Sequence, residues 1–268
     1  MKFDILTLFP SFFDSPLKES LIGKAVDKGL IEVGRVNMRD YTPGGVGSGS
    51  KDSKVDDSPY GGGAGMVLMA EPVVKAIEDA RGARGTGGES SEVDGQKSAK
   101  VVLLTPQGRP FNQSLARELA EEDHLILVCG KYEGFDERIR EFADLEVSLG
   151  DFVMTGGEVA ALALIDTVAR LKTGVVGKGE SLERESFGSD EGLGALLEYP
   201  QYTRPEEFRG MKVPPVLLGG NHKEIDEWRR RESIKRTLKR RPDLIDKAVA
   251  EGSLTKKDLE TIKELKKQ

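Results

Sequence analysis

The chain has 268 residues, 37% of them hydrophobic, with 40 Lys and Arg against 46 Asp and Glu, a net charge of −6. This length predicts one large domain, or one large and one small, with enough buried surface to fold without disulfides. The single cysteine, Cys129, excludes an internal disulfide. The sequence also lacks a run of ~20 apolar residues for a membrane span and the basic, apolar start of a signal peptide. We therefore expect a soluble, cytoplasmic protein without membrane contacts.

Short apolar runs predict buried strands at residues 2–9, 101–105 and 125–129, and an alternating run predicts a fourth strand at 145–149. The first three are apolar almost throughout, which is typical of strands covered on both faces of a parallel sheet. Helical patterns lie between and after these runs, at residues 16–28, 71–80, 112–122 and 158–172. The alternation predicts an α/β fold, with a mainly parallel sheet flanked by helices.

Two segments rich in glycine and charge interrupt this pattern. Residues 81–99 are expected to form a flexible surface insertion, and residues 174–200 a linker or active-site loop. The predicted domains are therefore an α/β domain at 1–173 and a small all-α domain at 201–268. Helices are expected in the second domain at 222–240, 244–250 and 256–267, the first of them preceded by an Asn221 to Glu224 pair spaced like a capping box.

Charge is distributed unevenly between the two predicted domains. Residues 204–268 carry 18 Lys and Arg against 12 Asp and Glu, whereas residues 1–203 carry 22 against 34. Basic clusters at 229–231 and 239–241 could pair with phosphates, although a charged run is more often a solvated helix face. The segregation favours an RNA contact for the second domain. Trp228 could stack on a base, but packing within this small domain is the favoured interpretation.

Three polar, glycine-containing loops each follow a predicted strand: 105–109 (TPQGR), 130–134 (GKYEG) and 150–158 (GDFVMTGGE). Ligands of open parallel sheets bind beyond the carboxyl ends of the strands, and glycine there lets the main chain approach a ligand closely. One such loop is more often only a helix cap or a turn. Three together predict a single ligand pocket.

Other site types lack their motifs. No G-x-G-x-x-G follows the first strand, and no phosphate-cradling G-x-x-x-x-G-K-[ST] occurs. With two histidines and one cysteine we expect neither a structural metal site nor a Cys/His or Ser/His nucleophile. Residues 59–66 (PYGGGAGM) place four glycines within five residues. Such a backbone could lie against a nucleobase with Tyr60 stacking on it, or it could be a flexible loop tip.

Seven motifs in order, PYGGGAGM, TPQGR, VCGKYEGFDERI, LGDFVMTGGE, ESF, EYPQYTRP and VPPVLLGGNH, resemble the bacterial tRNA (guanine-N1)-methyltransferases, the TrmD family of SPOUT methyltransferases. The similarity runs from Met1 to about Arg241 without the 81–99 insertion. The resemblance implies methylation of N1 of guanosine 37 of tRNA, with S-adenosyl-L-methionine as the methyl donor. It also implies a homodimer with its active site at the subunit interface, and a deep C-terminal trefoil knot in the α/β domain, which general topology rules disfavour.

The resemblance further implies which residues form the site, with the three glycine loops making the knot around the donor. The implied donor-binding residues are Leu104, Pro106, Gly108, Gly130, Tyr132, Glu133, Gly134, Leu149, Gly150, Asp151, Phe152, Val153, Met154, Gly156 and Gly157. The implied substrate-binding residues are Tyr60, Gly61, Gly62, Gly63, Ser181 and Arg204. The family is linked to Mg²⁺, but the sequence shows no ligand cluster for it.

Guanine N1 carries a proton, so a carboxylate general base is needed to remove it while a cation offsets the charge that develops on the ring. The family's base is an aspartate directly before Ser-Phe; this chain has Glu185 there, one methylene longer. Arg170 corresponds to the family's arginine that places the base. Without the resemblance, Glu185 would be one of several acidic linker residues.

Two other functions stay open at this point. One is a knotted ribose 2′-O-methyltransferase, from which the ESF and PYGGGAGM motifs distinguish this chain. The other is a noncatalytic RNA-binding protein that retains a nucleotide pocket, against which an intact donor pocket with Glu185 and Arg170 argues.

Overall fold

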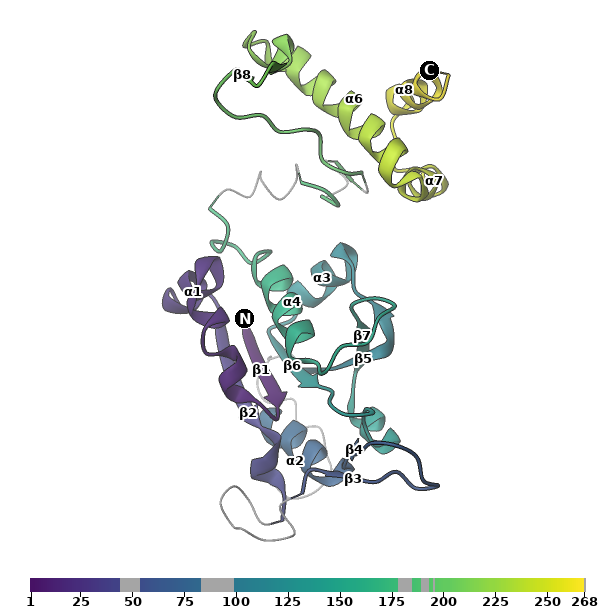
Figure 1. Cartoon of the computed structure of the whole chain (residues 1–268). Helices are drawn as coiled ribbons and strands as arrows, with labels where there is room; N and C mark the ends of the chain where they lie inside the picture. The colour runs from purple at the N-terminus through teal and green to yellow at the C-terminus, as the bar shows by residue number, and fades with distance from the viewer. Residues whose placement is uncertain (44–53, 83–98, 178–184, 189–192, 195, 268) are drawn as a thin grey trace. The chain divides into compact units, whose positions relative to one another are not determined.

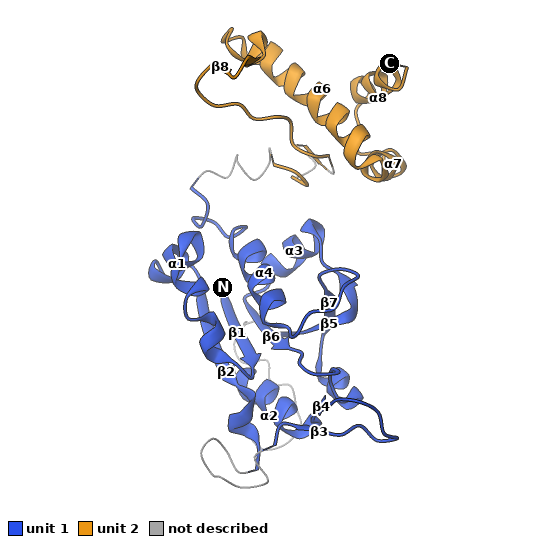
Figure 2. Cartoon of the chain, viewed as in Figure 1, with its two compact units in different colours: residues 1–177 blue, residues 178–268 orange. Residues whose placement is uncertain are grey.

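The computed structural model describes residues 1–43, 54–82, 99–177, 185–188, 193–194 and 196–267 (Figure 1). The chain divides into two compact units, Met1–Gly177 and Lys178–Gln268 (Figure 2), and each unit is described by itself. The predicted insertion at 81–99 lies outside the described residues except at its ends. Among the helices that the structure describes, none has the length and apolar character needed to cross a membrane.

The first unit is built on a parallel sheet with the strand order β2-β1-β6-β5-β7, so the predicted sheet type is confirmed. Its strands are β1 (Lys2–Thr7), β2 (Glu32–Asn37), β5 (Lys100–Pro110), β6 (His124–Cys129) and β7 (Leu145–Ser148). The sequence reading missed β2, an edge strand without buried residues whose polar and small side chains make no apolar run. Two very short strands, β3 (Asp56–Asp57) and β4 (Val67–Leu68), pair with each other.

The expectation that residues 105–109 form a loop after a strand is wrong. Strand β5 continues through them, and its pairing with β7 shifts register between Leu104 and Arg109. Arg109 and Pro110 pair with β7 again, so TPQGR is a bulge within one long strand. Gly108 is needed at this bulge, because a Cβ there would lie 2.3 Å from the backbone nitrogen of Val147.

Helices cover both faces of the sheet, and alternate strand residues point to each. Phe3, Leu125 and Leu127 belong to the core beside α1 (Ser20–Asp27), α3 (Gln113–Ala120) and α4 (Glu158–Ala169), whereas Leu6, Ile126 and Val128 belong to the core beside α2 (Ala70–Ala80). The predicted helix at 16–28 is a 3-10 turn, Pro16–Lys18, followed by α1, because Glu19 is extended. Further 3-10 helices are η1 (Pro10–Phe13), η3 (Met38–Tyr41) and η4 (Glu137–Phe142).

In the described part of the second unit, α6 (His222–Arg240) packs against α7 (Pro242–Ala250) and α8 (Lys256–Leu265). A short hairpin, β8 (Glu207–Phe208) with β9 (Met211–Lys212), and η5 (Pro215–Leu217) precede them. Asn221 is the N-cap of α6, and its side chain accepts from the Glu224 N–H. Glu224 Oε1 accepts from the Asn221 side chain at 2.8 Å instead of from its backbone N–H, so only the N-cap half of the predicted capping box forms. The core of this unit is formed by Leu196, Ile234, Ile245 and Ile262.

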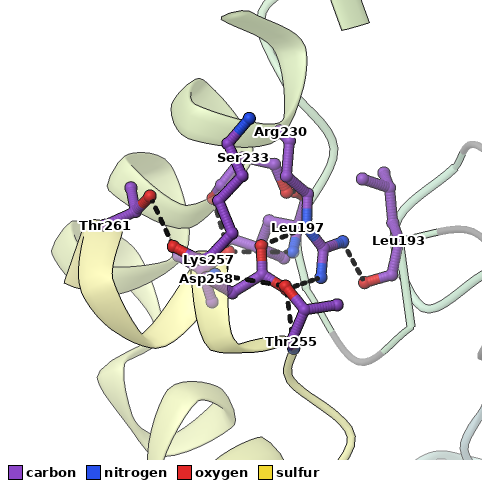
Figure 3. Close-up of polar contacts among 9 residues, drawn as sticks. Leu193, Leu197, Arg230, Ser233, Thr255, Lys257, Asp258 and Thr261 are labelled. Carbon is purple, nitrogen blue, oxygen red and sulfur yellow. Dashed lines mark hydrogen bonds and ion pairs between the residues drawn. The ribbon is translucent and has the colours of Figure 1, made fainter. Parts of the chain in front are cut away.

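A buried ion pair joins α6 to α8 (Figure 3). Arg230 Nε and Nη2 donate to the two carboxylate oxygens of Asp258 at 2.9 and 3.0 Å, and the Asp258 side chain is only 4% exposed. The Thr255 N–H and hydroxyl donate to the same carboxylate at 2.9 and 2.7 Å. Burial alone would raise the pKa of Asp258, but the hydrogen bonds from Arg230 and Thr255 outweigh it and lower that pKa below its usual value.

We predict that Asp258→Asn lowers the free energy of unfolding of the second unit at pH 7 by about 3 kcal/mol, because the Arg230 charge loses its buried partner. The carboxylate pKa is lower in the folded chain, so the stabilisation is present above the unfolded pKa of about 4 and is lost as pH falls through the folded value. The measurement is urea unfolding at pH 7 and pH 3, followed by the fluorescence of Trp228, the single tryptophan. Asp246→Asn, at an exposed position in α7, is the control. An Asp258→Asn variant with unchanged stability at pH 7 would contradict the prediction.

Candidate functional site

A cavity of about 360 Å³ lies in the first unit at the bulge of β5 and at the carboxyl ends of β6 and β7. It is lined by the β5 bulge, by the turn at 130–135 that follows β6, and by residues 147–149 and 152–157 at and after the end of β7. The three glycine motifs, far apart in the sequence, therefore meet around one cavity. Its volume is in the range of small-molecule sites, and its place is where parallel sheets bind ligands.

Most of the residues expected to bind a donor line this cavity. They are Leu104, Pro106, Gly130, Tyr132, Glu133, Gly134, Leu149, Phe152, Val153, Met154, Gly156 and Gly157. The expected residues Gly108, Gly150 and Asp151 are described but are not part of the lining. Gly108 packs on the β7 backbone. Gly150 has φ +151° and its carbonyl accepts from the Phe152 N–H at 2.9 Å, so it shapes the turn that carries the lining residues.

Main-chain contacts hold the three segments together. The Gly157 N–H donates to the Gly130 carbonyl at 2.8 Å, and Lys131 forms an isolated antiparallel bridge with Gly156. A Cβ at Gly157 would lie 2.7 Å from Cys129 Cα, and one at Gly130 would lie 3.0 Å from the Leu104 carbonyl oxygen. Real Cβ atoms essentially never lie closer than 3.0 Å, so glycine is required at 157, whereas a side chain at 130 would fit only if its neighbours moved by a few tenths of an ångström. The main chain at these glycines forms part of the cavity wall.

The turn after β6 holds Tyr132 in the left-handed region, at φ +61°. The Gly134 N–H closes the turn onto the Lys131 carbonyl at 3.1 Å. A bulky residue at positive φ is unusual and occurs preferentially at functional sites. Burial raises the pKa of the Tyr132 hydroxyl, and Asp56 raises it further. The hydroxyl therefore stays protonated at neutral pH and can donate a hydrogen bond.

The glycine-rich motif at 59–66 lies beside the same turn. The Glu133 N–H donates to the Met66 carbonyl at 3.0 Å, and the Leu68 N–H donates to the Gly134 carbonyl at 2.9 Å. Gly65 has φ +85°, and a Cβ there would lie 2.3 Å from Glu133 Oε1. Tyr60 is fully exposed, as are its neighbours Gly61, Gly62 and Gly63. The motif is thus anchored at its end beside the cavity and presents an aromatic ring to solvent.

Sequence reasoning missed several lining residues. They are Thr105, Gln107, Lys131, Phe135, Glu137, Arg140, Val147, Ser148, Thr155 and Ala160. Most lie inside the recognised motifs, so extending the site to whole motifs would have found them. Arg140, Val147, Ser148 and Ala160 lie outside those motifs. Arg140 donates to Gln107 Oε1 at 2.6 Å, to Glu137 Oε2 at 2.9 Å and to Glu146, and so connects the β5 bulge, η4 and β7.

The other expected site residues are distributed over both units. Arg170 is the half-buried C-cap residue of α4 in the first unit. Glu185 and Arg204 belong to the second unit, Glu185 half-buried and Arg204 exposed. Ser181 lies outside the described residues. Within the parts of the chain that are described, no group of three or more His, Cys, Asp or Glu side chains could hold a metal ion.

The basic clusters of α6 differ in their partners. Arg230 pairs with Asp258, Arg231 with Glu264 at 3.0 Å, and Arg241 with Asp243 at 2.7 Å. Lys239 and Arg240 are exposed and form no ion pair with any residue that the structure describes. Trp228 is half-buried, with its ring 6.4 Å from that of Tyr202.

Comparison with known proteins gives one consistent result. A family model described as tRNA (Guanine-1)-methyltransferase TrmD matches residues 1–247. The tRNA (guanine-N(1)-)-methyltransferase of Geotalea uraniireducens (strain Rf4) is 51% identical over 268 residues, covering 100% of this chain and 98% of that protein. The protein of the same description from Dictyoglomus turgidum is 45% identical over the same shares. A crystal structure of tRNA (m1G37) methyltransferase from Aquifex aeolicus matches with a TM-score of 0.68 and 37% identity, over 94% of this chain and 97% of that chain.

We predict that Gly157→Ala weakens binding of S-adenosylmethionine by tenfold or more, about 1.4 kcal/mol, because the added Cβ must displace the backbone of Cys129 and Gly130. Isothermal titration calorimetry measures the affinity. The matched control is Gly177→Ala, since a Cβ at Gly177 would have no heavy atom within 4 Å. Unchanged donor affinity in Gly157→Ala would show that the donor binds elsewhere.

Proposed function

Because the chain belongs to the TrmD family of tRNA (guanine-1)-methyltransferases, we propose that it transfers a methyl group from S-adenosyl-L-methionine to N1 of guanosine 37 in tRNA, next to the anticodon. One observation carries the proposal. The three glycine motifs by which the chain resembles this family form the wall of one cavity. Neither alternative has an observation of its own in its favour.

We further propose that the first unit contains the family's deep trefoil knot. Strand β7 is at the sheet edge beside β5. The chain that leaves β7 nevertheless pairs with the turn after β6 at Gly156 and Gly157, and then forms α4, which packs on β6 and β1. The chain therefore crosses back over the end of β5. This crossing supports a knot.

The residues of the cavity fit the proposed donor. Main-chain groups between Gly130 and Gly134 and near Gly157 can hydrogen-bond the adenine, and the carboxylate of Glu133 complements a cationic ligand. When bound, the donor supplies an electrophilic methyl carbon attached to a sulfonium sulfur. The chain contributes orientation, because the glycine main chain at Gly130, Gly156 and Gly157 forms part of the wall and side-chain rotation cannot rearrange it.

In the proposed reaction Glu185 accepts the N1 proton of the guanine, and N1 forms a bond to the methyl carbon as the bond from that carbon to sulfur breaks. Arg170 supplies positive charge that offsets the charge on the carboxylate and on the ring. Glutamate keeps the carboxylate of the family's aspartate and adds one methylene.

The second unit is proposed to bind the tRNA. Its excess of basic residues, with Lys239 and Arg240 exposed at the end of α6, supports binding to phosphates, while the acidic first unit would repel RNA elsewhere. The target guanine has to leave its stack to reach the cavity. Tyr60 and the glycines that follow it are exposed and could receive the base.

Assembly and location are also part of the proposal. We propose a homodimer with the active site at its interface, supported by the exposed apolar side chains of Phe9, Phe12, Leu21 and Val159 in the first unit. A cytoplasmic location follows from a tRNA substrate. Mg²⁺ could assist the reaction, but no described residue cluster identifies a site for it.

The test of the function is methyl transfer from tritiated S-adenosylmethionine to two tRNA transcripts that differ only at position 37, guanosine or adenosine. We expect label only in the guanosine transcript, recovered as N1-methylguanosine. Label on a ribose would support the 2′-O-methyltransferase alternative. Donor binding without transfer to any tRNA would support the noncatalytic alternative. Either result overturns the proposal.

We predict that Glu185→Gln lowers the rate of methyl transfer by at least about 100-fold, because the amide cannot accept the N1 proton, and leaves donor affinity unchanged. Glu185→Asp, which restores the family's residue, should retain most of the activity. Stopped time courses give the rate and calorimetry the affinity. Glu206→Gln, at an exposed position in the same unit, is the control. Full activity of Glu185→Gln would exclude Glu185 as the base.

A further inference from the structure

The proposed base lies in a tight turn that needs support from outside. The Gly188 N–H donates to the Glu185 carbonyl at 3.0 Å, and Phe187, between them, has φ +62°. A phenylalanine in the left-handed region is strained, and such a conformation persists only where surrounding contacts hold it. The contacts that hold this turn are therefore part of how the Glu185 carboxylate is placed.

Two hydrogen bonds attach the turn to residues 196–198. The Glu198 N–H donates to Ser186 Oγ at 2.9 Å, and the Phe187 N–H donates to the Leu196 carbonyl at 3.2 Å. Both residues that follow the carboxylate are thus bonded to the same short segment. Any movement of residues 196–198 would move Glu185 as well.

Helix α6 holds that segment with side chains that are completely buried. The Leu197 N–H donates to Thr237 Oγ1 at 3.0 Å, and Ser233 Oγ donates to the Leu197 carbonyl at 2.5 Å (Figure 3 shows the Ser233 bond). Ser233 and Thr237 are both 0% exposed. Both backbone groups of one residue are therefore bonded by hydroxyls of a single helix face, one turn apart.

Side chains of α6 make two further hydrogen bonds to this part of the chain. Arg236 Nη1 donates to the Glu198 carbonyl at 3.1 Å, and Arg230 Nη1, from the group paired with Asp258, donates to the Leu193 carbonyl at 3.4 Å (Figure 3). Leu196 is fully buried in the core with Ile234. Leu193, Leu197 and Glu198 are thus each hydrogen-bonded to α6.

From these contacts we infer that Ser233 and Thr237 are positioning residues for methyl transfer, acting on Glu185 through Leu197 and Ser186. The inference rests on the proposed function. If Ser233 and Thr237 position Glu185, the base is held by the second unit, which is also the unit proposed to bind tRNA. Because a displacement of about 1 Å can cost about 100-fold in rate, hydroxyls that never touch the substrate can control the reaction.

The test compares Thr237→Val, which removes the acceptor for the Leu197 N–H, with Thr237→Ser, which keeps it. We expect the single-turnover rate of methyl transfer to fall by about 10- to 100-fold in Thr237→Val and to be largely restored in Thr237→Ser. Donor affinity, which depends on the first unit, should not change. Thr261→Val is the matched control, because the Thr261 hydroxyl donates only within α8, to the Lys257 carbonyl at 2.9 Å.

A double variant tests whether Thr237 acts through the base. If it does, Thr237→Val should cost little further rate in a Glu185→Gln background, since the group it positions is already disabled. Ser186→Ala, which removes the bond at the turn itself and leaves the buried helix face intact, should lower the rate like Thr237→Val. This second variant keeps the test valid should Thr237→Val fail to fold.

Outcomes of the two proposals are distinguishable. A wild-type chain that transfers no methyl group would refute the proposed function. A wild-type chain that is active while Thr237→Val and Ser186→Ala are equally active would refute the positioning inference alone. If Thr237→Val lowers the rate of the Glu185→Gln variant by the same factor as it lowers that of the wild type, the inference is also refuted, because Thr237 would then act independently of Glu185.

Discussion

The close main-chain contact between Gly130 and Gly157 is the constraint on which the site depends. Their hydrogen bond of 2.8 Å joins the end of β6 to the chain that leaves β7, and a Cβ at Gly157 would lie 2.7 Å from Cys129 Cα. Leu104 of β5 pairs with Cys129, so the β5 bulge, the end of β6 and the chain after β7 lie side by side. The cavity lies where these backbones meet.

The two units contribute different chemistry. The first unit has a net negative charge and contains the cavity; the second has a net positive charge and carries Glu185 on a segment bonded to α6. The basic residues of α6 also serve two purposes. Arg230 stabilises the helix packing through Asp258, whereas Lys239 and Arg240 remain exposed. A cluster that looks uniform in sequence therefore separates into structural and surface residues, and only the surface residues are available to phosphates without breaking an ion pair.

Local signals in the sequence were sufficient for much of the fold. Continuous apolar runs identified β1, β6 and the first half of β5, and the Asn221 cap identified the start of α6. Strand β2 has no such run, because it is an edge strand without buried residues. Its strand conformation is stabilised by backbone pairing with β1, which its side chains do not predict. TPQGR read as a loop because its proline and glycine are turn formers; its return to pairing with β7 depends on a strand about 40 residues later in the chain.

The sequence by itself determined the family, the sheet type and the motifs that would meet, since these depend on residue identity and local periodicity. Only the tertiary structure decided that PYGGGAGM lies beside the turn at 130–134, that Arg140 connects three segments, and that Ser233 and Thr237 hold the backbone behind Glu185. The contacts of Met66 with Glu133, of Arg140 with Gln107, and of Ser233 and Thr237 with Leu197 each join residues more than 30 positions apart. The physical reason is that a serine or arginine inside a helix has the same local pattern whether it faces solvent or bonds a distant backbone, and its partner is chosen by how the chain packs.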